Sequence, residues 1–510
     1  MDRRPPPASI HVLDDDSLLN VFHLYQPFLL GEGEDEDNRL IGGRGRWVHA
    51  RWWHKLSHVC RRWRRVILGS ASYLELSLAC TKGTPVADML AHSPPLPLDI
   101  DYFDEDVEIA AEDEEGAILA LKQYNRLRRV RLQMSVAILQ NLIVAMDDEY
   151  PILEYLIIGL PNEDRSSILI FPETFQAPHL RHLALADFAL PIGSRLLTTA
   201  VSLVTLYLYV VHPSTYFYPN TLLRWLSFMP QLETFSIGFL SPVPSRDIER
   251  QLTHTPITTP ITLPNLRFFR FQGVTTYLEA LVHRITAPRL ERLQIGFFNQ
   301  LTYSVTRLLQ FVNATENLKF KSAKFSFFDE LLDVELYPHE AEVYALSITV
   351  NCCHLDWQVF SAAQIFNVLS PLFSAVEHLT LQHEVHSQSS EEHNEADRTK
   401  WRRLLGSFRN VKTLRIREGL VEELSRCLEL GDGELPLEVL PELQELTYPG
   451  PGSGNTSDAF TSFIDARQDA GRPVNLVRHS PNPNRSSSVP PLEPPLTTPA
   501  GGEAGGDPNT

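Results

Sequence analysis

The most persistent pattern along this chain is a short motif of the form apolar-x-x-apolar-x-apolar, which recurs between residues 127 and 448. Apolar residues two positions apart lie on one face of a β-strand, so each copy predicts a short strand with one buried face. A unit that recurs along a chain in this way predicts a repeat architecture. The copies are Leu127/Val130/Leu132, Leu153/Leu156/Ile158, Leu180/Leu183/Leu185, Leu203/Leu206/Leu208, Leu232/Phe235/Ile237, Leu266/Phe269/Phe271, Leu290/Leu293/Ile295, Phe320/Ala323/Phe325, Val343/Leu346/Ile348, Val376/Leu379/Leu381, Val411/Leu414/Ile416 and Leu443/Leu446/Tyr448.

The copies predict a solenoid of the α/β class, with a curved parallel sheet, over residues 71–449. A strand with one apolar face cannot bury that face alone, whereas parallel stacking with a helix or loop behind each strand makes one continuous core. Residues 222–228 and 305–312 are amphipathic and are the expected return helices. Alternating apolar residues at 74–78 and 96–100 predict further strands before the first copy.

The copies are similar to leucine-rich repeats but irregular. Their first positions lie between 23 residues (Leu180 to Leu203) and 35 residues (Val376 to Val411) apart, whereas leucine-rich repeats span about 20–29 residues. Leucine-rich repeats also carry Asn or Cys three residues after the last apolar position, and here only Asn351 follows that rule. We therefore expect an irregular, leucine-rich-repeat-like solenoid.

Before residue 70 the apolar positions have helical spacing, which predicts a helical module over residues 10–70. Its first helix follows Asp14–Asp16, whose carboxylates suit a helix N-terminus, and ends near Pro27. A second helix is predicted around residues 47–66, and the Gly-rich, acidic segment 31–46 is expected to be a solvated loop. The apolar positions are Leu18, Leu19, Val21, Phe22, Tyr25, Trp52, Leu56, Val59, Cys60, Trp63 and Ile67.

Other segments carry no pattern that could build a core. Residues 1–9 and most of 450–510 are expected to be disordered, although a short helix is predicted near 457–470. The polar segment 382–399 predicts an exposed loop. The carboxylate-rich stretch 99–115 predicts a solvated loop or a helix start.

Composition and charge exclude several classes of function. The chain has 510 residues, 43% of them hydrophobic, which is enough for a large core and two or three structural units. Its net charge of −18 argues against nucleic-acid binding, which depends on Lys and Arg. No apolar run approaches the roughly 20 residues of a membrane helix, and the N-terminus lacks the apolar core of a signal peptide. The five cysteines include no CxxC pair, so we expect free thiols. Together these features predict a cytoplasmic or nuclear protein that binds no membrane.

The sequence lacks the usual catalytic motifs, including a phosphate-binding loop, a dinucleotide fingerprint and a nucleophile elbow. His383 and His386 stand three residues apart, whereas a zinc-binding helix places its histidines four apart. The adjacent Cys352 and Cys353 follow a predicted strand and are expected on opposite faces. We therefore predict no catalytic residue, metal ligand or cofactor; an enzyme that uses the two histidines is the weakest alternative.

The N-terminal stretch resembles an F-box. The resemblance rests on Leu13, Leu18, Leu19, Val21 and Phe22, followed by Leu56 and by Val59-Cys60-Arg61-Arg62-Trp63-Arg64. The run 63–70, together with Thr84–Ala87 and Ser93–Leu98, is similar to a large group of fungal F-box proteins.

This resemblance implies a role in ubiquitin ligation. F-box proteins dock on the Skp adaptor of cullin-type ubiquitin ligases and select a protein substrate through a further domain, here the predicted repeats. The resemblance implies no chemistry by this chain, because ubiquitin transfer belongs to other subunits. The residues expected to bind the adaptor are Leu13, Leu18, Leu19, Val21, Phe22, Val59, Cys60 and Trp63.

The sequence departs from the F-box pattern at three places. Asp14 stands where the family usually has proline, Ser17 stands where it usually has an apolar residue, and the linker 31–46 is longer than usual. These departures leave a second function open, namely a leucine-rich-repeat interaction scaffold outside any ligase.

Overall fold

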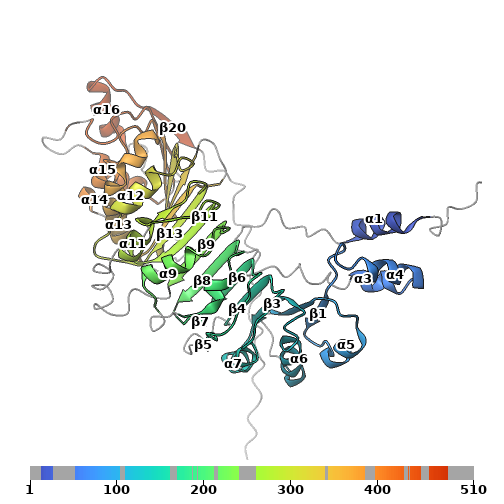
Figure 1. Cartoon of the computed structure of the whole chain (residues 1–510). Helices are drawn as coiled ribbons and strands as arrows, with labels where there is room; N and C mark the ends of the chain where they lie inside the picture. Colours follow the sequence, from blue (N-terminus) through green and yellow to red (C-terminus); the bar gives the residue numbers. More distant parts are fainter. Residues whose placement is uncertain are drawn as a thin grey trace, which may run out of the picture.

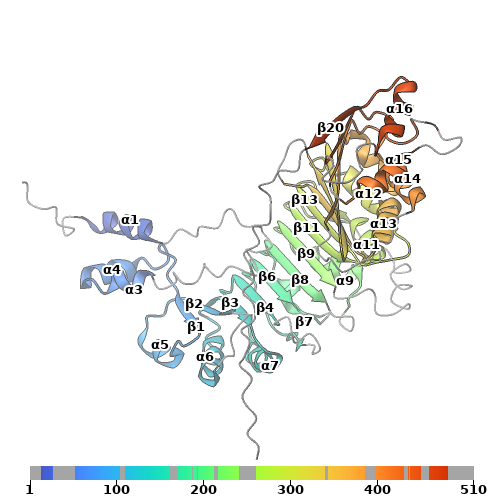
Figure 2. The same cartoon turned by 180° about the vertical axis from the view of Figure 1, so that it is seen from behind.

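The protein forms one long curved sheet with helices packed along it (Figures 1 and 2). The N-terminal helices lie beyond one end of the sheet, and the last strand lies at the other end (Figure 1). The computed structural model describes residues 13–26, 52–103, 110–160, 169–186, 188–191, 193–211, 216–239, 260–338, 343–384, 397–417, 419–429, 435, 437–449 and 459–479.

Sixteen strands make up the main sheet, and neighbouring strands are parallel except at β15. In spatial order they are β1 (Leu78–Thr81), β2 (Leu98–Phe103), β3 (Leu127–Gln133), β4 (Tyr155–Gly159), β6 (His182–Ala186), β8 (Thr205–Val211), β9 (Thr234–Phe239), β11 (Phe268–Gly273), β13 (Arg292–Phe297), β16 (Leu346–Asn351), β15 (Leu331–Tyr337), β14 (Ser322–Phe328), β17 (His378–Glu384), β18 (Thr413–Ile416), β19 (Glu445–Pro449) and β20 (Asn475–His479). Two small parallel pairs lie outside this sheet: β5 (Leu169–Ile170) with β7 (Phe188–Ala189), and β10 (Ile261–Thr262) with β12 (Ile285–Thr286).

Helices return the chain between many of the parallel strands, as parallel pairing requires. Two of them, α9 and α12, overlap the return helices predicted at 222–228 and 305–312. The helices are α1 (Asp15–Tyr25), α3 (Trp52–Ser57), α4 (Arg61–Gly69), α5 (Val86–His92), α6 (Ala111–Leu121), α7 (Val136–Val144), α8 (Arg195–Thr199), α9 (Pro219–Leu226), α11 (Thr275–Val282), α12 (Thr306–Asn313), α13 (Leu355–Val368), the 3-10 helix η3 (Ser370–Ala375), α14 (Arg398–Leu405), α15 (Val421–Leu428) and α16 (Thr461–Asp469).

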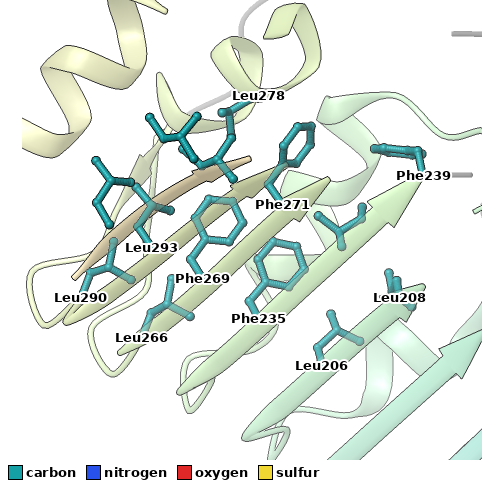
Figure 3. Packing of buried hydrophobic residues seen from close by; sticks show 14 of the residues in the cluster. Leu206, Leu208, Phe235, Phe239, Leu266, Phe269, Phe271, Leu278, Leu290 and Leu293 are labelled. Carbon is teal, nitrogen blue, oxygen red and sulfur yellow. The ribbon is translucent and has the colours of Figure 1, made fainter. Parts of the chain in front are cut away.

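The apolar positions of the repeated motif form the core between sheet and helices. Parallel pairing without a shift puts like positions side by side, so Phe235 lies between Leu206 and Phe269, and Phe269 lies beside Leu293 (Figure 3). The rings of Phe235 and Phe269 are stacked, with centroids 5.3 Å apart. Every apolar position of the motif is buried except Val343. The predicted large sheet of mostly parallel strands, with return helices, is therefore confirmed.

Val343 is exposed because the chain departs from simple repetition there. The two strands before it, β14 and β15, form an antiparallel hairpin, and β16 then inserts between β13 and β15. The buried face of β16 begins at Leu346, the first residue of the strand, whereas Val343 precedes the strand and is 57% exposed. The prediction that Val343 is buried was wrong. Side-chain periodicity does not reveal whether a strand is parallel to its neighbour.

The single helix predicted over residues 47–66 is also wrong within the described residues. Two short helices, α3 and α4, are separated at residues 58–60. Cys60 has an extended backbone (φ −159°, ψ 169°) and its Sγ accepts a hydrogen bond from the Trp63 N–H, so it caps α4. The first helix, α1, ends at Tyr25, two residues before the predicted stop at Pro27.

Three predicted loops or boundaries need correction. The sheet continues past residue 449, because β20 pairs in parallel with β19. The helix between these two strands in sequence, α16, falls within the predicted 457–470. Asp99 is buried in β2 rather than solvated, and Gln382 is buried in β17, where its side-chain amide donates to Ser326. The predicted loop 31–46, the N-terminus 1–9 and the tail from 480 lie outside the described residues.

One hydrogen bond ties the N-terminal helices to the first strand region. The Trp53 indole N–H of α3 donates to the Ser77 carbonyl at 3.3 Å, and the Ser77 hydroxyl donates to the buried Asp99 carboxylate at 2.5 Å. Trp53 is itself 5% exposed. Removal of the indole N–H would leave the buried Ser77 carbonyl without this hydrogen-bond donor.

Trp53→Phe is expected to lower the free energy of unfolding by about 1–3 kcal/mol, because it keeps an aromatic ring but removes the indole donor. Guanidinium titration measures this loss, and hydrogen exchange should show faster opening in α3. Trp357→Phe, at a position that is 43% exposed in α13, is the matched control and should change little. Equal effects of the two variants would contradict the prediction.

Candidate functional site

The first helix, α1, is capped by its own N-terminal residue and is joined to α4 by Arg62. Asp14 accepts a hydrogen bond from the Ser17 N–H at 2.7 Å and caps α1, and this bond holds the pKa of Asp14 below its usual value. Arg62 of α4 lies 2.8 Å from the Asp15 carboxylate and donates to the Leu13 carbonyl at 2.6 Å. Asp14 in place of proline is thus compatible with a well-capped first helix.

The structure divides the eight predicted docking residues into two groups. Leu18 and Phe22 are buried, and the Phe22 ring packs edge-on against Trp63 with centroids 4.9 Å apart. These side chains hold α1 against α4 and are not available to a partner in this arrangement. The remaining residues are exposed or partly exposed: Leu13, Val21 and Val59 are exposed, and Leu19, Cys60 and Trp63 are partly exposed.

The exposed apolar side chains of α1 form a second face, of which the sequence prediction named Val21 and Tyr25 but not Leu24. Val21, Leu24 and Tyr25 are 42%, 73% and 56% exposed and lie at positions i, i+3 and i+4. We call these three residues the outer face of α1. Leu24 did not fit the predicted stripe, yet a helix with apolar residues on two sides is itself a signal of a partner.

A second surface is the sheet face opposite the core, where side chains alternate with the buried repeat positions. Ile157, Ala184 and Tyr207, from β4, β6 and β8, form a small cluster of their own. Phe103, Tyr155 and Tyr209 pack against it. We call these six residues the aromatic cluster of the sheet. No single repeat contains it, because each strand contributes one or two residues.

Charged pairs flank the aromatic cluster on neighbouring strands. Asp101 and Arg131 lie 3.7 Å apart, and the Arg131 guanidinium lies 4.5 Å from the centre of the Phe103 ring. Asp99 and Arg129 lie 3.9 Å apart, and burial raises the pKa of Asp99 although Arg129 opposes the shift. Further along the same face, the Arg292 guanidinium lies 4.4 Å from the centre of the Tyr344 ring.

The hairpin strand β15 adds a carboxylate with a raised pKa to this face. Asp333 accepts hydrogen bonds from Ser347 and Thr349 at 3.2 and 3.0 Å. Burial raises the pKa of Asp333, and the neighbouring Glu335 raises it further, while the two hydroxyls and Lys324 oppose the shift.

A raised pKa means that the folded chain takes up this proton at a higher pH than the unfolded chain. The contribution of Asp333 to the free energy of unfolding should therefore increase as the pH falls from above its folded-state pKa to below its unfolded-state pKa. The same contribution should be lost as the pH rises through the folded-state pKa. Asp333→Asn should remove this component, seen as a wild-type-minus-variant difference that grows toward low pH in guanidinium titrations. Glu330→Gln, at an exposed turn position of the same hairpin, is the control. A constant difference between wild type and Asp333→Asn would contradict the prediction.

The residues considered for metal chemistry are not gathered in one place. Within the described part of the chain, no group of three or more His, Cys, Asp or Glu side chains is arranged to hold a metal ion. Cys352 is buried and Cys353 is exposed, as expected for neighbours on opposite faces. His383 lies in β17, and His386 lies outside the described residues. The helices within the described ranges are all too short or too polar to cross a bilayer.

Comparisons with known proteins place this chain in no family. No family model and no curated protein matches the sequence. Among solved structures, the leucine-rich repeat-containing protein LegL7 from Legionella pneumophila is similar, at 10% sequence identity, over 78% of this chain and 98% of that chain, with a TM-score of 0.24. A TM-score this low carries no argument, so the repeat architecture rests on the strand pairing itself.

Proposed function

We propose that this chain is an F-box substrate-recognition subunit of an SCF-type ubiquitin ligase. The observation that carries the proposal is the arrangement of the two segments that resemble an F-box. They fold as helices packed through Phe22 and Trp63, and they leave apolar side chains on the outside at Val21, Leu24, Tyr25 and Val59. Exposed apolar side chains on a rigid helical unit suit a partner's groove.

In this proposal the Skp adaptor binds the outer face of α1 together with Val59 in the α3–α4 turn. Leu18 and Phe22 support that surface from within rather than contact the adaptor. Leu13, Leu19, Cys60 and Trp63 are partly or fully exposed and contribute contacts at its border. The cullin is then recruited through the adaptor, not through this chain.

The repeat sheet is the proposed binding surface for a protein target. The partly exposed members of the aromatic cluster, Phe103, Tyr155 and Tyr209, lie over its buried residues, and aromatic groups of this kind often dominate protein interfaces. The chain itself performs no chemistry in this proposal, and it acts by holding the target near the ubiquitin-transferring subunits.

Co-expression of the full chain with a Skp adaptor and a cullin tests the proposal. The expected result is one complex that contains all three proteins on size-exclusion chromatography. Recovery of the chain without adaptor and cullin would overturn it.

The alternative, a repeat scaffold outside any ligase, is motivated by the departures from the F-box pattern at Asp14 and Ser17. It predicts that a pull-down with this chain recovers target proteins but neither the adaptor nor the cullin. Recovery of a cullin together with the adaptor would remove this alternative.

A further inference from the structure

Most copies of the repeated motif carry a charged residue directly after their first apolar position. Each of these charged residues lies next to the first residue of its strand, at one edge of the sheet. The charge alternates in sign from one charged copy to the next along the chain, without exception: Arg128, Glu154, Arg181, Glu233, Arg267, Glu291, Lys321, Glu377 and Lys412. The uncharged copies have Val204, Tyr344 and Gln444 at this position. We call the charged residues the charge ladder.

Backbone hydrogen bonds place neighbouring members of the charge ladder side by side. The Glu154 N–H donates to the Arg128 carbonyl at 2.8 Å, and the Arg181 N–H donates to the Glu154 carbonyl at 2.9 Å. The same bond joins Arg267 to Glu233, Glu291 to Arg267, Glu377 to Lys321 and Lys412 to Glu377. The ladder is interrupted by Val204, between Arg181 and Glu233, and by β16 and β15, between Glu291 and Lys321. Side chains at paired positions of adjacent strands are close enough to interact.

Ion pairs link the side chains of neighbouring repeats along this ladder. They are Arg128–Glu154 at 2.9 Å, Arg267–Glu291 at 3.8 Å, Lys321–Glu377 at 3.6 Å and Lys412–Glu377 at 3.1 Å. The hydrogen bond from Lys412 and the charge of Lys321 hold the pKa of Glu377 below its usual value. Exposed ion pairs are each worth little, about 0–1 kcal/mol. Stability alone is therefore a weak reason for a pattern that continues along the sheet.

The apolar positions do not distinguish one repeat from the next. Leu156, Leu183 and Leu206 occupy equivalent places on β4, β6 and β8, so Leu183 has the same type of residue on both sides. A strand can therefore bury its apolar face against the next-but-one strand, with one repeat looped out. Misassembly is a characteristic failure of repeat proteins, so the correct order needs a further signal.

Alternating charges penalise this error. Omission of one repeat would pair residues of like charge: Arg128 with Arg181, Glu233 with Glu291, or Lys321 with Lys412. Like charges directly opposite each other on adjacent strands destabilise the pairing. At Val204 the signal is missing, because omission of that repeat would pair Arg181 with Glu233.

We propose that the charge ladder specifies the order in which the repeats pair during folding, because correct neighbours attract each other and next-but-one neighbours repel each other. The inference holds whether or not the chain joins a ligase. It concerns Lys321, Glu377 and Lys412 most directly, since Glu377 contacts both lysines.

Full-length variants that are unfolded and refolded in urea, which is uncharged and leaves the ion pairs unscreened, test the proposal. Glu377→Lys gives three like charges in a row and should raise the unfolding equilibrium constant about 5- to 30-fold and lower the refolding yield. The inverted variant, Lys321→Glu/Glu377→Lys/Lys412→Glu, restores the alternation and should recover both values. Glu316→Lys makes the same change of charge at an exposed turn outside the ladder and should change neither.

A neutral variant separates the order of pairing from stability. Lys321→Gln/Glu377→Gln/Lys412→Gln should unfold close to the wild-type urea midpoint, because exposed ion pairs contribute little. Its refolding yield should nevertheless be lower, measured as the fraction of monomer on size-exclusion chromatography with the wild-type hydrogen-exchange pattern. A neutral variant that refolds as well as the wild type would overturn the proposal. An inverted variant that refolds no better than Glu377→Lys, or equal losses in Glu377→Lys and Glu316→Lys, would also overturn it.

Discussion

Val59→Asp is expected to abolish capture of a Skp adaptor while the chain remains folded. Val59 lies in the turn between α3 and α4 and is 58% exposed, so a carboxylate there stays in water in the free protein and costs little. In a complex the same carboxylate would be buried in an apolar groove without a partner. Such an unpaired charge costs about 3–5 kcal/mol, which weakens binding by at least about a hundredfold.

The adaptor titrated onto immobilised wild-type and variant chains measures this effect. Val343→Asp is a matched control, because Val343 is 57% exposed and lies before β16, far along the sequence from the helices. It should bind the adaptor like the wild type. Adaptor binding that is unchanged in Val59→Asp would exclude the proposed docking surface, and equal losses in the two variants would point to a general effect of charge.

Phe22→Ala is a poorer test of docking than the sequence suggests. Phe22 is 1% exposed and packs against Trp63, so its removal would loosen α1 from α4. Lost adaptor binding in that variant would not separate a damaged interface from a damaged module. Exposed positions such as Val59 avoid this ambiguity.

Phe269→Ala is expected to lower the free energy of unfolding by about 3–5 kcal/mol, the cost of removing a large aromatic side chain from a packed core. Phe269 is fully buried, stacks on Phe235 and lies beside Leu293 of the next strand (Figure 3). Each repeat is stabilised mainly by its neighbours, so a cavity here weakens the contacts on both sides.

Guanidinium titration followed by circular dichroism measures this loss. Phe228→Ala makes the same substitution at a position that is 38% exposed, and it should cost markedly less. Similar losses in the two variants would contradict the view that the aligned apolar positions carry the stability of the sheet.

Local periodicity was sufficient to predict most of the strands. The two-residue alternation of each motif copy fixes which side chains enter the core, and this property does not depend on distant parts of the chain. The first helix was predictable for a similar reason, since Asp14 and the apolar spacing that follows it are adjacent in sequence. The break between α3 and α4 was missed because Cys60 is an unusual helix cap.

Features that depend on distant residues were decided by the tertiary structure. Pairing partners of a strand are chosen by packing, so the order β13-β16-β15-β14-β17 and the exposed Val343 could not be read from the motif. Asp99 was expected in water because its sequence neighbours are acidic, yet it is buried between Ser77, the residue before β1, and Arg129 of β3.

The sequence by itself determined a repeated strand with one apolar face and a helical N-terminus, because both follow from the spacing of neighbouring side chains. Only the tertiary structure separated Phe22 from Val59, as core and surface of the same helical unit. It also brought Glu438 within 3.3 Å of Arg402 in α14, 36 residues earlier in the sequence. Burial and contacts of this kind arise where surfaces meet in space, and the distance between two residues along the chain does not set them.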